Sequence, residues 1–377
     1  MGTAVAGGSN GLPVYLVDAN PNQRANAAAA LAGYYDVREF GEASAVLSAL
    51  EAQPPAVLVL DGHVMPKGGL AVLKAAKEMP GLAETAILCT DGDPRGVFLA
   101  NAQRLKVQAL LEKPVSPEKL FGLVTKAVTR RLERGWAGLD DPGRAALVRC
   151  RKVFGEAVEA LGNENPLPFE GVAQACQPLV SALDEGQAPT LLAAVDGHPD
   201  LMFVHAVRSA VFLALFGGAM GLATDDRITI AAGGLLQDLG KAGVGAEVLK
   251  KRGPLEPREW KAMRAHVWHT VAFLRRSKGV RKGAITIAEQ HHERLDGSGY
   301  PWGLAGEELN ELARMAGIVD VYAAMTERRL HRDALSPQEA LKTMAGMGDK
   351  LDQRMVKAFT AVLLKTLEQA GDTPVGA

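Results

Sequence analysis

Cysteine is scarce in this sequence. Cys89, Cys150 and Cys176 are the only three, and none of them forms a CxxC pair. An odd, widely spaced set predicts neither a disulfide framework nor a zinc ribbon, and it suits a reducing compartment. Net charge is nearly absent too, with 42 basic and 43 acidic residues, which argues against nonspecific nucleic-acid binding because such binding needs a basic surface.

Long hydrophobic runs are also missing. The longest uncharged apolar stretch, between Arg208 and Asp225, is short and glycine-rich, so we expect a buried core helix and no membrane span. The first residues, MGTAVAGGSNG, lack a basic segment before an apolar core, so residues 1–12 are expected to be a flexible tail and not a signal peptide. These features predict a cytoplasmic protein, and 377 residues suggest two or three domains.

Residues 13–125 alternate between strand and helix patterns. Short apolar runs occur at Val14–Val17, Val57–Leu60, Ala86–Cys89 and Val107–Leu111, and helical segments occur between them at Ala25–Gly33, Ala43–Gln53 and Leu70–Met79. Alternating elements of this kind predict an α/β domain with a parallel, doubly wound sheet, whose ligands bind beyond the carboxyl ends of the strands. The first three runs are followed directly by Asp18, Asp61 and Thr90.

These polar residues, together with Lys113-Pro114, resemble the receiver domain of two-component response regulators. The resemblance implies a flavodoxin-like, five-stranded parallel sheet over residues 13–125, with Asp61 as phosphoacceptor, Asp18 as a Mg²⁺ ligand, and Thr90 and Lys113 in contact with the phosphoryl group. It also implies phosphorelay from a sensor histidine kinase. The chemistry suits the set, because a carboxylate nucleophile forms an acyl phosphate while a hard cation and a lysine neutralise the transferred charge. We expect Asp61 to be exposed at the carboxyl edge of the sheet.

Two positions depart from the receiver pattern. The family carries a second carboxylate where this chain has Ala19, so Mg²⁺ should bind weakly. Leu110 stands where an aromatic switch residue is usual. The alternative interpretation is a receiver fold whose polar residues at the strand ends are not phosphorylated.

Helical patterns dominate after Ser116, which with Pro117 predicts a helix start. The charged stretch Thr129–Trp136 and a second predicted helix from about Arg144 to Leu161 favour a helical linker over residues 126–165. Such a segment couples domains or pairs across a homodimer, and a plain solvated spacer is the alternative. Because no alternating strand pattern follows Asn163–Pro168, residues 166–370 are expected to form an all-α domain.

The run QHHERLDGSGYP at residues 290–301 is the most informative motif. Paired imidazoles next to carboxylates suit a two-metal site, because neutral imidazole is the commonest metal ligand. The alternative is a solvated polar loop with two incidental histidines. The run resembles the signature of the HD-GYP family, metal-dependent phosphodiesterases that hydrolyse the bacterial messenger cyclic di-GMP. The resemblance implies an HD-type helical domain over residues 166–370.

Further polar residues inside apolar helical segments match the same family pattern. Metal coordination explains them better than burial alone, because unpaired carboxylates and imidazoles are costly inside a protein. The resemblance implies two divalent metals (Fe, Mn or Zn) bridged by Asp238, one held also by His205 and Asp320 and the other by His266, His291 and His292. It further implies Lys241 beside the reacting phosphate and a substrate-binding set of Arg294, Tyr300, Arg329 and Arg332.

Gln237 is the main departure from the HD-GYP pattern, which has histidine before Asp238. A neutral amide is a poorer ligand than imidazole for these metals, so one metal should bind weakly. Two functions follow. The first is a response regulator that hydrolyses cyclic di-GMP, with full or reduced activity. The second is a catalytically impaired relative that acts by binding a cyclic dinucleotide, or a partner protein through the GYP loop. An HD hydrolase of other nucleotides is a third, disfavoured by the intact GYP loop.

Overall fold

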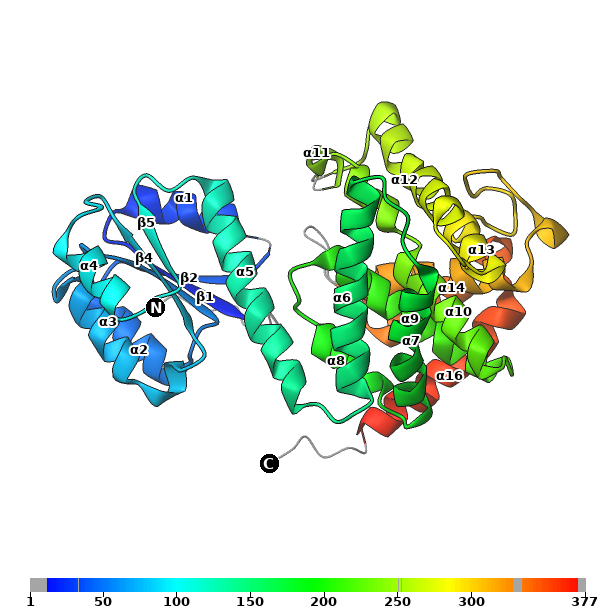
Figure 1. The fold of residues 1–377 in the computed structure, drawn as a ribbon, viewed down its shortest axis with the longest axis horizontal. Helices are drawn as coiled ribbons and strands as arrows, with labels where there is room; N and C mark the ends of the chain where they lie inside the picture. Colours follow the sequence, from blue (N-terminus) through cyan, green and yellow to red (C-terminus); the bar gives the residue numbers. More distant parts are fainter. Residues whose placement is uncertain (1–11, 33, 250, 252, 328–333, 372–377) are drawn as a thin grey trace. The chain divides into compact units, whose positions relative to one another are not determined.

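The computed structural model describes residues 12–32, 34–249, 251, 253–327 and 334–371, and the chain divides into two compact units. The first unit comprises Met1–Arg134 with Gly197–Pro199, and the second comprises Gly135–Asp196 with Asp200–Ala377. Figure 1 shows the first unit as a sheet flanked by helices, in blue to cyan, and the second as a bundle of helices, in green to red. Each unit has its own core.

The first unit is a five-stranded sheet in the order β2-β1-β3-β4-β5, with every pair parallel. The strands are β1 (Pro13–Val17), β2 (Asp36–Phe40), β3 (Val57–Asp61), β4 (Ala86–Asp91) and β5 (Ala109–Glu112). The helices are α1 (Pro21–Leu31), α2 (Ala43–Ala52), α3 (Gly68–Glu78), the short η1 (Pro80–Leu82), α4 (Val97–Arg104) and α5 (Pro117–Gly135). The predicted doubly wound parallel sheet is therefore confirmed, in the flavodoxin-like order of receiver domains.

Two apolar layers cover the sheet. On one side α2, α3 and α4 bury side chains such as Val46, Leu73 and Phe98, and on the other α1 and α5 bury Leu31 and Val124. Strand β2 was not predicted from the sequence, because its residues DVREF are largely charged. A strand at the sheet edge tolerates them, since its side chains are only half covered.

The described residues of the second unit form helices joined by loops, with no strand among them, as predicted. Its α-helices are α6 (Gly143–Gly162), α7 (Phe169–Asp184), α8 (Ala188–Val195), α9 (Leu201–Ala219), α10 (Thr224–Leu236), α11 (Ala246–Leu249), α12 (Pro257–Arg276), α13 (Lys282–Gln290), α14 (Glu311–Thr326), α15 (Pro337–Ala345) and α16 (Gln353–Gly371). Short 3₁₀ turns complete it: η2 (Trp136–Gly138), η3 (Leu239–Gly243), η4 (Gly306–Glu308) and η5 (Gly348–Lys350).

The segment expected as a helical linker, residues 126–165, is helical but is not a separate element. Its first part continues α5 to Gly135, where the division between the two units falls. Its second part, α6, buries an apolar stripe that includes Leu147, Cys150 and Phe154 in the core of the second unit. This segment was expected to couple domains or pair across a homodimer, with a solvated spacer as the alternative, but its apolar stripe at helical spacing packs against α7.

Helix α9 lies at the centre of the second unit. It is long and apolar enough to cross a membrane by length and composition alone, yet 72% of its most apolar window is buried inside the protein. The expected core helix is thus confirmed. Helices α9 and α10 approach closely at Gly234, where an added Cβ would lie 2.9 Å from the Ser209 carbonyl carbon and 3.0 Å from the Ala210 nitrogen. Only glycine fits at this crossing.

Replacing Gly234 with alanine should destabilise the second unit. The added methyl group would force the two backbones apart, and overpacking of this kind costs about 1–3 kcal/mol. Urea unfolding followed by circular dichroism would measure the loss. Gly155→Ala in α6 is the matched control, because nothing lies within 4 Å of its added Cβ, and it should be neutral or slightly stabilising. Equal midpoints for Gly234→Ala and Gly155→Ala would contradict the close-approach argument.

Candidate metal centre

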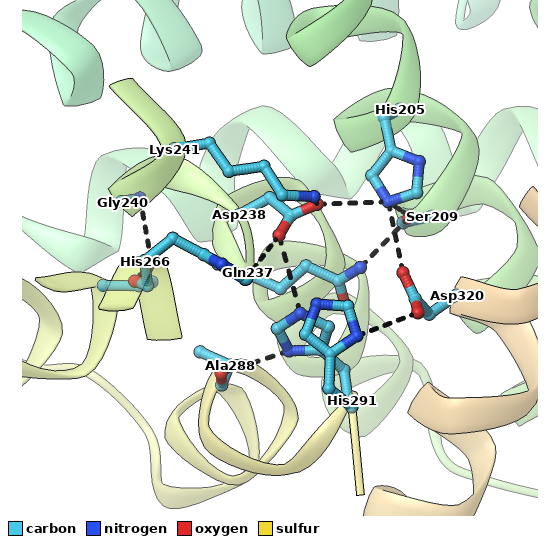
Figure 2. Close-up of polar contacts among 12 residues, drawn as sticks. His205, Ser209, Gln237, Asp238, Gly240, Lys241, His266, Ala288, His291 and Asp320 are labelled. Atoms are coloured by element: carbon cyan, nitrogen blue, oxygen red, sulfur yellow. Dashed lines mark hydrogen bonds and ion pairs between the residues drawn. The ribbon is translucent and has the colours of Figure 1, made fainter. Parts of the chain in front are cut away.

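Six polar side chains converge inside the second unit although they come from distant parts of the chain. They are His205 on α9, Asp238 between α10 and η3, His266 on α12, His291 and His292 at the end of α13, and Asp320 on α14. Figure 2 shows His205, His266, His291 and Asp320 gathered around Asp238. Gly240 permits this convergence, because a Cβ there would lie 2.1 Å from the His266 carbonyl oxygen. The sequence predicted all six residues as one cluster.

The two oxygens of Asp238 face two different groups of side chains. Its Oδ1 lies 3.1 Å from His266 Nε2 and 3.5 Å from His291 Nε2. Its Oδ2 lies 3.3 Å from His205 Nε2, which in turn lies 3.5 Å from Asp320 Oδ1. Two sets of ligand atoms each gather within 4.8 Å: Asp238 with His266, His291 and His292, and Asp238 with His205 and Asp320. Asp238 is therefore placed to bridge two cations.

The hydrogen bonds of two histidines orient their rings toward Asp238. Nδ1 of His266 lies 2.6 Å from the Met263 carbonyl, and Nδ1 of His291 lies 3.1 Å from the carbonyls of Ile287 and Ala288. Because a carbonyl only accepts, each Nδ1 donates its hydrogen there, which directs each Nε2 at Asp238 Oδ1. Within the described chain these Nε2 atoms and Asp238 Oδ1 are buried without hydrogen bonds. Positive charge at this point, from a bound cation or from protonated imidazoles, would compensate the buried carboxylate.

Burial and neighbouring charges shift the pKa values in this cluster in opposite directions. Burial, aided by the charge of His291, lowers the pKa of His292 to about 3, which favours a neutral ligand. Burial also lowers the pKa of His266. For His205, burial acts to lower the pKa but Glu327, Asp320 and Asp238 outweigh it and raise the pKa to about 9. A metal bound by His205 would displace a proton held there.

Glu327 supports His205 and was not identified from the sequence. Its Oε2 lies 2.8 Å from His205 Nδ1, and both side chains are buried. A carboxylate on the second ring nitrogen fixes the orientation of a ligand histidine and raises its basicity. The two residues lie 122 positions apart, so no local spacing could have paired them.

Lys241 lies beside Asp238, with its ammonium nitrogen 2.5 Å from Oδ2. Burial raises the pKa of Asp238, but Lys241 and the neighbouring imidazoles outweigh this and hold that pKa well below its usual range. Asp238 therefore stays ionised inside the protein. The positive charge of Lys241 lies next to the oxygen that faces His205 and Asp320, as Figure 2 shows.

Gln237 lies on the same side of Asp238 as His205. The amide is buried, and its nitrogen donates a 3.4 Å hydrogen bond to Ser209 Oγ, which lies 3.5 Å from His205 Nε2. The Gln237 oxygen has no hydrogen-bond partner among the described residues. Through Ser209, the Gln237 amide is therefore linked to His205, in the half of the cluster that His205 forms with Asp238 and Asp320.

The predicted substrate-binding residues have different surroundings. Arg294 Nη1 donates to the carbonyls of His291 (3.2 Å) and Glu293 (2.8 Å), and Nη2 lies 3.9 Å from Asp320. These donors hold the loop after α13, so that part of the guanidinium is not free for a phosphate. The Tyr300 ring packs 4.6 Å from the His292 ring at 32°. Arg329 and Arg332 lie outside the described residues.

The loop that follows His292 is shaped by Glu293 and a glycine. Glu293 is buried and accepts hydrogen bonds from the backbone nitrogens of Trp302 (2.7 Å) and Leu304 (3.1 Å). At Gly299 an added Cβ would lie 2.4 Å from the Arg294 nitrogen, so the loop folds back onto its own start. This closure presses Tyr300 against His292.

A second polar pocket lies at the carboxyl end of the sheet in the first unit. Lys113 Nζ lies 2.6 Å from Asp18 Oδ2 and 2.5 Å from Asp61 Oδ2, and Thr90 Oγ1 lies 3.5 Å from the same Asp61 oxygen. The four predicted residues are thus brought together. The pocket measures about 430 Å³ and is lined by Asp18, Ala19, Asn20, Gln23, Asp61, His63, Gly92, Lys113 and Pro114.

Two features of this pocket differ from expectation. Asp61 was expected to be exposed but is only 2% exposed. Its Oδ2 forms an ion pair with the Lys113 ammonium, and its Oδ1 accepts a hydrogen bond from the His63 backbone nitrogen. Asp91, which follows Thr90 and is also buried, was not considered. It lies 3.8 Å from His63 Nδ1 and adds a carboxylate beside Asp61. Leu110 on β5 is 38% exposed.

Comparison with known proteins agrees with this division. Residues 189–355 match the family model of the HD domain. The 3'3'-cGAMP-specific phosphodiesterase 3 of Vibrio cholerae serotype O1 is 34% identical over 172 residues, which are 46% of this chain and 37% of that protein. The cyclic di-GMP phosphodiesterase response regulator RpfG of Xanthomonas campestris pv. campestris is 34% identical over 143 residues, 37% of this chain and 38% of that protein.

Among solved structures, the HDG"Y"P protein Bd1817 from Bdellovibrio bacteriovorus is similar with a TM-score of 0.48 and 16% identity, covering 67% of this chain and 88% of that one. The chain spans less than half the length of these two curated relatives. Within the second unit, residues 189–355 are similar to the HD domain, and the first unit has the strand order of the flavodoxin-like fold.

Metal content should depend on the half of the cluster that lacks Gln237. We expect about one tightly held divalent metal per chain, since only one of the two halves keeps a full ligand set. His291→Ala should remove it with little loss of helical content, as judged by elemental analysis and circular dichroism. His269→Ala on α12 is the matched control, because His269 belongs to neither group of ligand atoms. Retention of metal by His291→Ala would refute the assigned ligand set.

Phosphorylation of Asp61 should require high Mg²⁺. Without a carboxylate at position 19, and with Asp91 adding negative charge, a small phosphodonor such as acetyl phosphate should label the protein weakly. Ala19→Asp should lower the Mg²⁺ concentration needed by about tenfold, because ligand charge sets the affinity of such sites. Ala19→Asn is the neutral control. Stoichiometric labelling of the unaltered chain at micromolar Mg²⁺, measured by phosphate-affinity electrophoresis, would show that Ala19 is not limiting.

Proposed function

We propose that this chain is a two-component response regulator whose HD-type unit hydrolyses cyclic di-GMP. The observation that carries the proposal is the bridging placement of Asp238, with one oxygen toward three histidines and the other toward His205 and Asp320. Paired cation sites sharing a carboxylate suit in-line displacement at a phosphodiester. The relatives named as cyclic dinucleotide phosphodiesterases support the same reaction class.

The chemistry supplied by two bound divalent cations (Fe, Mn or Zn) would be a water of lowered pKa and polarisation of the phosphodiester. The protein's own residues prepare that site. His266 and His291 are fixed by backbone carbonyls with Nε2 directed at Asp238, and Glu327 fixes His205. These constraints hold the ligands in place before substrate arrives, which lowers the cost of reorganisation during reaction.

Lys241 supplies positive charge beside the reacting phosphate in this proposal. Its ammonium already pairs with Asp238 and is part of the same half of the cluster as His205. A fixed ammonium there stabilises negative charge as it develops on a phosphate oxygen. Tyr300 and Arg294 are proposed to line the substrate site near His292. Arg294 positions the loop, and Tyr300 contacts His292. Arg329 and Arg332 are proposed to hold the second phosphate.

The first unit is proposed to receive a phosphoryl group on Asp61 from a sensor histidine kinase, with Mg²⁺ held weakly by Asp18 and Asp61. Thr90 and Lys113 are close enough to contact that group, since both already contact Asp61. We further propose a cytoplasmic homodimer that can engage a partner protein through the loop at residues 296–301.

A binding role without catalysis is the second candidate function. It is favoured by the substitutions at the two cation sites, Ala19 in the first unit and Gln237 in the second. Gln237 leaves a buried amide oxygen without a hydrogen bond in the described structure, in the half of the cluster where a histidine would bind metal. In this case the protein would bind the dinucleotide without cutting it.

Gln237→His should separate the two candidates. Restoring an imidazole should raise metal occupancy and turnover of cyclic di-GMP together, by about tenfold or more, since even indirect losses around metal ligands change activity 10–100-fold. Chromatography of the linear dinucleotide product measures the rate, and Gln237→Leu, which offers no ligand atom, is the control. Near-zero turnover of Gln237→His with both metals bound would favour the binding role. High turnover before any substitution would show that Gln237 is tolerated.

A further inference from the structure

Three of the four tryptophans are exposed and lie on one surface. Trp260 and Trp268 on α12 are each 45% exposed, and Trp302 in the loop after α13 is 53% exposed, whereas Trp136 is buried. Trp260, Arg264 and Trp268 follow one another at intervals of four, so they share one face of α12. Large exposed aromatic residues gathered in this way mark a binding surface. We call these residues, with Tyr300, the tryptophan surface.

The side chains of this surface contact one another in a fixed pattern. The guanidinium carbon of Arg264 lies 5.6 Å from the Trp260 ring centre and 4.9 Å from the Tyr300 ring centre. The rings of Trp268 and Trp302 meet edge to face at 4.4 Å and 80°. Arg264 is exposed and forms no ion pair with any carboxylate that the structure describes, so its charge and its fork of N–H donors are available to a ligand.

The tryptophan surface adjoins the metal centre. The Tyr300 ring packs against the ring of His292, one of the predicted ligands. The guanidinium of Arg264 packs on the same Tyr300 ring. A substrate whose phosphodiester reaches the metal centre therefore extends over Tyr300 toward Arg264 and the two tryptophans. In Figure 1, α12 lies at the outer edge of the second unit, as this exposure requires.

We propose that a guanine base of a cyclic dinucleotide stacks on Trp268, with Trp302 against its edge, while Arg264 donates to its O6 and N7 atoms. The proposal rests on the proposed function, and it adds the residues that select the base. Every nucleobase can stack on an indole ring. Only guanine presents two adjacent acceptors, O6 and N7, to an arginine fork, whereas adenine presents a donor in place of O6.

The helical spacing places both interactions on one base. Arg264 and Trp268 are one turn apart on α12, so their Cβ atoms are neighbours on the helix surface. A ring laid on Trp268 therefore directs an edge toward the Arg264 fork. Trp260 and Tyr300 hold the guanidinium from two sides, which reduces the entropy lost when it binds. A docked protein could use the same residue types, but contact with His292 through Tyr300 favours the substrate.

Arg264→Gln should raise the KM for cyclic di-GMP about tenfold to a hundredfold with little change in kcat, because a bidentate arginine–guanine pair is worth roughly this much in discrimination. It should also reduce the preference for cyclic di-GMP over cyclic di-AMP. Arg264→Lys keeps the charge but not the fork, so it should not restore that preference. Arg258→Gln is the matched control, since Arg258 lies two residues before Trp260 and points to another face of α12. An unchanged KM and base preference in Arg264→Gln would overturn the proposal.

Binding of the dinucleotide tests the same idea without relying on turnover. Cyclic di-GMP added to the full chain without metal should quench tryptophan fluorescence, because most of the tryptophans lie in the stacking surface. Trp268→Leu should weaken binding about tenfold, whereas Trp268→Phe should retain most of it. If the unaltered chain quenches but does not hydrolyse, the catalytic proposal fails while the base subsite stands. Equal affinity of Trp268→Leu and the unaltered chain would overturn the subsite and leave the surface to a protein partner.

Discussion

The second unit depends on keeping the Asp238 carboxylate ionised inside a protein core. Removing such a charge from water is expensive unless counter-charges and hydrogen-bond donors surround it. The fold meets this requirement by bringing side chains from α9, η3, α12, α13 and α14 to one point. Lys241 compensates one oxygen of Asp238, and the other oxygen faces the imidazoles of His266 and His291. The packing of these helices therefore determines whether the Asp238 charge is compensated.

Rigidity in the site comes from contacts that are local to each helix. His266 and His291 are fixed by carbonyl oxygens within the preceding turn of their own helices, so their ring orientation follows from the helix position. The helix positions in turn depend on two close backbone approaches, at Gly234 and Gly240. A change in helix packing therefore alters the direction of the ligand atoms without altering any ligand residue.

The two units share a physical feature, since in each a lysine ammonium sits on the carboxylate that would bind a cation. Lys113 lies between Asp18 and Asp61, and Lys241 lies on Asp238. Each unit also lacks one side chain of its expected cation site, at Ala19 and at Gln237. The lysines keep the buried carboxylates compensated whatever the occupancy of the sites, so neither fold relies on its metal for charge balance.

Sequence patterns predicted most elements because apolar periodicity reports which residues face a core. They failed at β2, whose charged residues suit a sheet edge, and they assigned α6 to a linker although its apolar stripe is buried in the second unit. The six clustered residues were predicted from motifs and from the cost of burying polar groups in apolar helices. Glu327 and Arg264 were missed, because their partners are set by helix packing and not by neighbours in the chain.

The sequence by itself determined which residue types occupy the motifs and that an α/β unit precedes a helical one, since these follow from local composition and spacing. Only the tertiary structure decided where each side chain points. It placed the two Asp238 oxygens toward different groups, drew Asp61 beneath Lys113, and turned Arg294 onto backbone carbonyls. The reason is physical, because side-chain direction depends on the rotation and approach of packed elements, which many distant apolar contacts fix together.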